Sequence, residues 1–95
     1  MAKTIAVVPT DNGWKYLQQL CKHWSHKLEV GLTEQKGLVK FPEATAVMTS
    51  DAQALTVEIE ATSPEVLERM KEVVSSHLDR FAFKEAPLPF DWKVA

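Results

Sequence analysis

The pattern that most restricts the fold is the alternation in residues 55–61, Leu-Thr-Val-Glu-Ile-Glu-Ala. Apolar and polar side chains alternate there with a period of two, which is typical of a strand buried on one face only. Such a strand packs its apolar face against another layer of structure. We therefore expect a sheet with one covered face and one open face.

Further segments with short apolar runs or period-two alternation are also predicted strands. Pro9 ends the first of them, and Gly37, in the turn before the third, is expected to take a positive φ. Phe90, Trp92 and Val94 are expected to point inward from the last one. Besides residues 55–61, the predicted strands occupy residues 4–8, 28–33, 37–41, 44–48 and 90–94.

Two segments have apolar residues at helical spacing. The first runs from Asn12 to about Lys27, with Asp11 or Asn12 available as its N-cap. The second follows residues 62–65, Thr-Ser-Pro-Glu, which combine a hydroxyl cap, a proline for the first turn and an acid at the positive end of the helix dipole. It is expected to end near Phe81. The apolar positions are Trp14, Leu17, Leu20, Cys21 and Trp24, and then Val66, Leu67, Met70, Val73, Val74, Leu78 and Phe81.

The resulting order, β-α-β-β-β-β-α-β, predicts an α+β fold in two layers. Residues 28–61 form an antiparallel meander, and both helices cover one face of the sheet. A length of 95 residues with 45% hydrophobic content is enough for one core and too small for two, so residues 1–95 are predicted to form a single domain.

Charge and composition argue against several classes of partner. The net charge is −2, and Glu29, Glu58 and Glu60 are expected on the open face of the sheet, where they would repel a phosphate backbone. We therefore expect no nucleic-acid binding. No segment has the ~18 apolar residues of a membrane helix, and the N-terminus has no signal-peptide pattern, so no membrane association is expected. A single cysteine, Cys21, favours a reducing compartment, and we expect a cytoplasmic protein.

His23 and His26 lie three positions apart near the end of the first predicted helix. Two imidazoles at this spacing are close enough to share a metal ion, but a structural zinc site uses four protein ligands and a catalytic one three. The alternative is that both are exposed polar residues at a helix C-terminus, where protonated histidine interacts favourably with the dipole. A metal is left open, and the sequence requires no cofactor.

His77 falls inside the apolar stripe of the second helix, either as a hydrogen-bonded core residue or as the wall of a pocket that Arg80 could border. The predicted topology makes the two helices antiparallel. With both about fifteen residues long, or roughly 20 Å, their C-terminal ends should keep His77 away from His23 and His26. No three-histidine site is therefore expected within one chain. Cys21 is expected to be a buried, inert thiol.

Three blocks of sequence resemble the bacterial domain-of-unknown-function family numbered 2218: residues 16–27, YLQQLCKHWSHK, residues 75–85, SSHLDRFAFKE, and residues 90–94, FDWKV. One departure is Lys84, where arginine is more usual. The resemblance implies a TATA-binding-protein-like α+β fold and no established activity. Similar domains occur attached to or near siderophore-interacting flavin reductases, which implies a link to iron or siderophore metabolism. The matched positions are His23, His26, Lys27, His77, Arg80 and Phe83.

The leading functional prediction is a small cytoplasmic accessory or binding module, not an enzyme by itself, with a link to iron or siderophore metabolism. One alternative is a metal- or haem-binding protein that uses His23 and His26, either within one chain or at the interface of a dimer. A second is a small enzyme with a pocket at His77 and Arg80. The partner could be a protein or a small ligand, and the sequence does not determine the oligomeric state.

Overall fold

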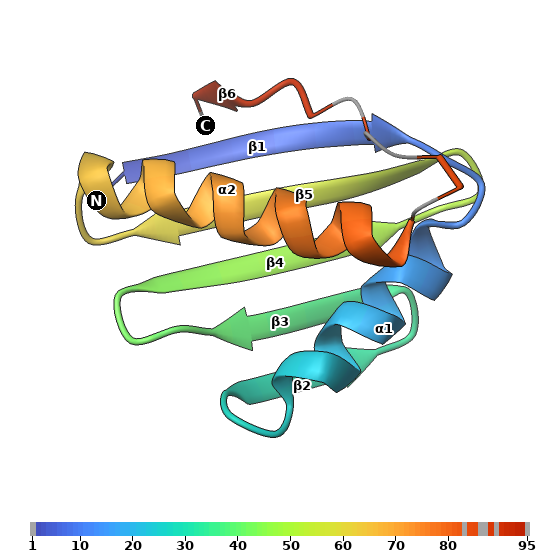
Figure 1. Ribbon diagram of the computed structural model, residues 1–95, viewed down its shortest axis with the longest axis horizontal. Coiled ribbons are helices and arrows are strands. Elements are labelled where there is room, and N and C mark those ends of the chain that lie inside the picture. Colours follow the sequence, from blue (N-terminus) through green and yellow to red (C-terminus); the bar gives the residue numbers. More distant parts are fainter. Residues whose placement is uncertain (1, 83, 86–87, 89, 95) are drawn as a thin grey trace.

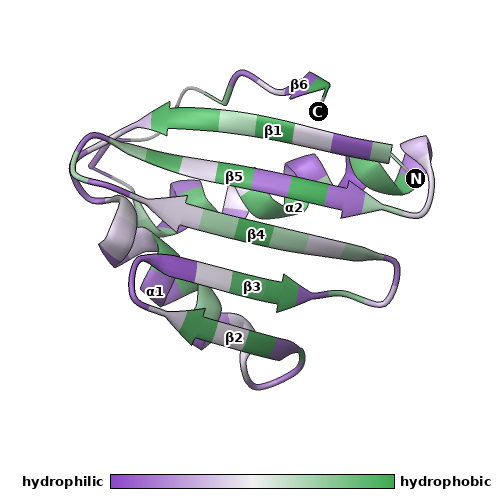
Figure 2. Cartoon of the chain, turned by 180° about the vertical axis from the view of Figure 1, so that it is seen from behind, coloured by the Kyte–Doolittle hydropathy of each residue, from purple (hydrophilic) through white to green (hydrophobic). Residues whose placement is uncertain are grey.

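The computed structural model describes residues 2–82, 84–85, 88 and 90–94. In these residues one antiparallel sheet, in the order β2-β3-β4-β5-β1-β6, carries two helices on a single face (Figures 1 and 2). The predicted α+β class, the two layers and the order of elements are confirmed. The elements are β1 (Ala2–Pro9), α1 (Gly13–Trp24), β2 (Glu29–Thr33), β3 (Lys36–Lys40), β4 (Ala44–Ser50), β5 (Ala54–Ala61), α2 (Pro64–Phe81) and β6 (Lys93–Val94).

The sheet combines a meander with an inserted first strand. Strands β2 to β5 follow one another as neighbours, and β1 pairs with β5 along its whole length, from Ala2 opposite Ala61 to Pro9 opposite Ala54. Helix α1 therefore starts next to the short edge strand β6 and must cross β5, β4 and β3 to reach β2 at the opposite edge. Figure 1 shows this oblique path of α1, in contrast to α2, which follows the strands.

The two helix starts differ in how well the sequence predicted them. The Ser63 side chain caps α2 by accepting a hydrogen bond from the Val66 backbone N–H at 3.3 Å, as predicted. Asn12 occupies the cap position of α1, but its side chain makes no capping hydrogen bond. Instead, the Thr10 hydroxyl accepts a hydrogen bond from the Asn12 backbone N–H at 3.1 Å.

Helix α1 ends at Trp24, three residues before the predicted end. The Ser25 hydroxyl donates to the Lys22 carbonyl at 2.8 Å, and the Leu28 backbone N–H closes a turn on the Trp24 carbonyl at 2.9 Å. Side-chain to backbone bonds of this kind compete with the helical pattern at a helix end. His26 consequently lies in the turn and not on the helix.

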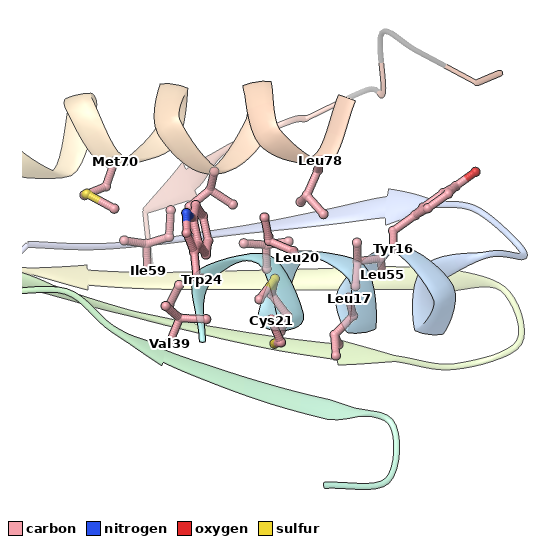
Figure 3. Packing of buried hydrophobic residues seen from close by; sticks show 14 of the residues in the cluster. Tyr16, Leu17, Leu20, Cys21, Trp24, Val39, Leu55, Ile59, Met70 and Leu78 are labelled. Carbon is pink, nitrogen blue, oxygen red and sulfur yellow. The ribbon is translucent and has the colours of Figure 1, made fainter. Parts of the chain in front are cut away.

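The core lies between the helices and the inner face of the sheet (Figure 3). Gly37 allows α1 to approach β3, because a Cβ atom there would lie only 2.6 Å from Cys21 Sγ and 3.0 Å from Leu17 Cδ2. The prediction that Gly37 takes a positive φ is wrong. Gln35 takes it, at 61°, and the glycine is needed for close packing instead.

The C-terminal strand is shorter than predicted. Only Lys93 and Val94 pair with β1. Val94 lies opposite buried Thr4, so its side chain is on the helix side of the sheet as predicted, but it is 95% exposed and does not join the core. Phe90 and Trp92 are half-buried against the core, as expected, and their rings stack at a centroid distance of 5.4 Å. The aromatic side chains thus pack without a regular strand, and only the last two residues of this segment reach the sheet edge.

No element in the described part of the chain covers the outer face of the sheet, seen in Figure 2. The predicted glutamates lie there, but lysines neutralise two of them: Lys3 pairs with Glu58 at 2.7 Å, and Lys40 with Glu29 at 3.0 Å. The face is thus mixed in charge and not acidic. Neither helix of the described residues has the combination of length and apolar character needed to cross a bilayer.

Candidate functional site: a histidine pair between the helices

The two helices bring His23 and His77 together. His23 is exposed on the last turn of α1, and His77 is half-buried on α2, with 5.5 Å between the ring centroids and 45° between the ring planes. The centroid of the Trp24 ring lies 5.0 Å from that of His77, and the centroid of the Phe81 ring lies 5.9 Å from that of His23. We call His23, Trp24, His77 and Phe81 the histidine cluster.

This contact contradicts the expectation that the helices keep His23 and His77 apart. The helices do run in roughly opposite directions, but α1 has 12 residues and α2 has 18, and α1 is oblique to α2 (Figure 1). Tyr16, in the first turn of α1, bonds to Glu85, beyond the end of α2. The first turn of α1 is thus held near the end of α2, and the His23 side chain on the last turn of α1 still reaches His77.

One hydrogen bond defines the state of the His77 ring. Its Nδ1 lies 2.6 Å from the carbonyl oxygen of Val73, one turn earlier in α2. A carbonyl oxygen can only accept, so Nδ1 carries the proton and donates it. In the neutral ring Nε2 is then left with a free lone pair. Metal-binding histidines typically have this arrangement, because the bond to the second ring nitrogen holds the ring and increases the basicity of the first.

The spacing of the pair also fits a shared ion. Two imidazoles bound at 2.0–2.1 Å to one tetrahedral ion place their ring centroids on the order of 5 Å apart. Across the described residues, however, no group of three or more His, Cys, Asp or Glu side chains is placed to hold a metal. The cluster therefore supplies two protein ligands, and the remaining coordination positions would fall to water or to donors of a bound molecule.

The other predicted ligand residues lie around this pair. His26 and Lys27 are exposed in the turn between α1 and β2, so the structure pairs His23 with His77 and not with His26. Arg80 is exposed on α2, three positions after His77, and residues at this spacing are neighbours on a helix surface. Phe83 lies outside the described residues. The ligand-binding role of these positions, and the enzyme pocket at His77 and Arg80, stay predictions.

The structure contains a second polar cluster, around Glu85, that the sequence did not predict. In the sequence Glu85 stands at no spacing from other acidic or basic residues that is typical of a functional site. The Glu85 carboxylate accepts hydrogen bonds from the Tyr16 hydroxyl, from Thr10 Oγ1 at 2.9 Å and from Asn12 Nδ2 at 3.1 Å. The bond from Tyr16, followed by that from Asn12, lowers the pKa of Glu85, while the carboxylate raises the pKa of Tyr16. This cluster fastens the segment after α2 to the start of α1.

Glu85→Gln tests this attachment through the dependence of stability on pH. A lowered pKa in the folded state stabilises the protein above the ordinary value of 4.5, and this stability is lost as the pH falls through the lowered value. At about pH 7 we expect the variant to have a lower melting temperature than the parent. This difference in melting temperature should shrink as the pH falls and disappear at about pH 2. Thermal unfolding followed by circular dichroism measures both, and Glu34→Gln, in the exposed β2–β3 turn, is the control. An equal difference at both pH values would contradict the ionic origin.

Cys21 is buried under α1, and burial raises its pKa to about 11. The thiol is therefore protonated at neutral pH, which confirms its expected position on the apolar face and makes it unsuitable as a nucleophile.

Comparison with known proteins places the chain in a family. The family model described as uncharacterized protein conserved in bacteria, DUF2218, matches residues 5–93. The chain belongs to this family. Among solved structures it is similar to PA4090 from Pseudomonas aeruginosa, determined by NMR, with 29% identity, a TM-score of 0.84, and 98% of this chain and 96% of that one covered. No curated protein matches the chain. The DUF2218 resemblance is thus confirmed over nearly the whole length.

Proposed function

We propose that this DUF2218 member is a small cytoplasmic binding module whose histidine cluster holds a first-row transition metal ion, alone or within a small anionic chelate. The distance of 5.5 Å between the His23 and His77 rings is the observation that carries the proposal. The proposal therefore uses a pair drawn from both helices in place of His23 and His26. The single buried thiol of Cys21 supports a reducing compartment.

The chemistry of the cluster supports a metal in preference to an organic ligand alone. Imidazole suits zinc, copper, iron and nickel, and the Val73 carbonyl already orients the His77 ring as a ligand. Because two protein ligands leave positions open, oxygen donors of a chelator can complete the coordination. Arg80, next to His77 on α2, and Lys27, after α1, can attract the negative charge of such a chelator. The link to iron or siderophore metabolism fits this picture and is carried by the family resemblance.

Isothermal titration calorimetry on protein without a histidine tag tests the site, with Zn²⁺, Cu²⁺ and Fe²⁺ added alone and Fe³⁺ added with citrate. We expect binding of at least one ion, weakened roughly tenfold or more in His23→Ala and in His77→Ala. His26→Ala is the matched control and should bind like the parent. Affinity should also fall at acid pH, since only neutral imidazole binds metal. Absence of binding, or a loss in His26→Ala equal to that in His23→Ala, would reject the pair.

A spectroscopic readout does not depend on removing a ligand. The chain has three tryptophans, and Trp24 lies 5.0 Å from His77 by ring centroids. In a variant with Trp14→Phe and Trp92→Phe, Cu²⁺ bound to the cluster should quench the emission of Trp24. Quenching of Trp14 or Trp92 instead, in variants that keep only those residues, would place the ion elsewhere.

A further inference from the structure

We propose that strand β2 pairs with β2 of a second copy of this chain, so that two sheets join edge to edge with Gly31 on the two-fold axis. The two edges of the sheet differ. At one edge, β6 has only two residues, Lys93 and Val94. At the other, β2 has five residues and no proline or lysine. Short strands, prolines and lysines are the usual protections of a sheet edge. Within the described residues, nothing pairs with the outer side of β2.

The hydrogen bonds of β3 and β4 determine which backbone N–H and C=O groups of β2 point toward the free edge. The Ser50 backbone N–H donates to the Gln35 carbonyl at 2.9 Å, so the backbone of Gln35 faces β4. Backbone direction alternates along an antiparallel strand, which turns Leu38 toward β2 and its partner Gly31 toward β3. The N–H and C=O groups of Val30 and Leu32 therefore point away from the sheet, toward the free edge.

A second copy fits these groups in one register. Only with Gly31 opposite Gly31 do all residues of Glu29–Thr33 overlap in an antiparallel pair. Val30 then lies opposite Leu32 of the other copy and exchanges both backbone hydrogen bonds with it, and the same pair recurs across the axis. Glu29 lies opposite Thr33, so no like charges face each other along the strands.

The side chains of this register also match. Val30 pairs with buried Val39 across β3, which places Val30 and Leu32 on the helix side of the sheet. There they line a groove of about 340 Å³ between α1 and β2, together with Gln18, Cys21, Lys22 and Ser25. A partner strand about 4.8 Å beyond the edge would bring its own Val30 and Leu32 to the open side of this groove. Leu32, now 46% exposed, would then be covered. Lys22 can extend its ammonium group to solvent.

Sedimentation velocity in the presence of EDTA tests this interface. The chelator removes metal ions, so a dimer bridged by a metal does not form and any dimer that is observed is independent of metal. From about 10 μM to about 500 μM we expect the parent to shift from monomer to dimer. Leu32→Lys should remain monomeric. Val7→Lys is the matched control, because Val7 is similarly exposed at 55% but lies on the open face of the sheet, and it should dimerise like the parent. A parent that is monomeric throughout, or dissociation in Val7→Lys but not in Leu32→Lys, would overturn the proposal.

Amide hydrogen exchange followed by NMR gives a second, variant-free readout. The amides of Val30 and Leu32 should become more protected as the protein concentration rises, whereas the Gly31 amide, which faces β3, should change little. Concentration-dependent protection elsewhere, with none at Val30 and Leu32, would also overturn the proposal. Neither outcome bears on the histidine cluster, which is tested separately by metal titration.

Discussion

Trp24→Ala should lower the free energy of unfolding by about 3–5 kcal/mol, as expected for removing a large buried aromatic side chain. Trp24 is only 7% exposed and packs edge to face against Phe41 at a ring-centroid distance of 5.0 Å. Figure 3 shows it between α1, α2 and the sheet. Since small domains have a total stability of about 5–15 kcal/mol, the loss would be a large fraction of the whole. Urea denaturation followed by circular dichroism measures it.

The other tryptophans provide controls of the same chemistry. Trp14 and Trp92 are half-buried at the margin of the core, so alanine at either position should cost clearly less than at Trp24. Trp24→Phe keeps most of the packing and should fall between the parent and Trp24→Ala. If Trp14→Ala were as destabilising as Trp24→Ala, the difference in burial between the two side chains would not determine the cost of removing them.

Gly37→Ala should be destabilising by about 1–3 kcal/mol, because the added methyl group overpacks a filled site. Its Cβ would lie 2.6 Å from Cys21 Sγ and 3.0 Å from Leu17 Cδ2, and both side chains are fully buried. To relieve the clash, α1 must move away from β3 or β3 must bend. The same denaturation experiment measures the change.

Gly31→Ala is the matched control, since its new Cβ would meet Leu38 Cβ at an ordinary 3.9 Å and should leave stability nearly unchanged. A double-mutant cycle with Cys21→Ala identifies the clash. Removing the sulfur should make Gly37→Ala less costly than it is in the parent, with a coupling of about 0.5 kcal/mol or more. Additive effects in the cycle would show that the sulfur is not the obstacle.

The sequence predicted the elements whose local signals and tertiary packing agree. Residues 55–61 alternate strictly and form all of β5 except its first residue, paired on both sides. The cap at Ser63 and the following proline correctly marked the start of α2. In these places one residue pattern specifies both the local conformation and the buried face, so periodicity was sufficient.

The candidate site could not be predicted in the same way, because it depends on how two helices cross. The contact of His23 with His77 joins residues 54 positions apart, and it arises from the oblique path and short length of α1. Glu85 was missed for the same reason, since its partner Tyr16 lies 69 positions away. Gly37 was assigned to a turn because glycine has two uses, positive φ and close approach, and the sequence does not distinguish them.

The position of Cys21 has a practical consequence. Its sulfur lies between α1 and β3, and the residue is only 1% exposed beneath the groove that it helps to line, so a disulfide-exchange reagent reaches it only when α1 moves away from the sheet at this point. The rate of thiol labelling in native buffer therefore measures how often this part of the protein opens. Comparing that rate with global unfolding would show whether α1 detaches alone or together with the rest of the domain.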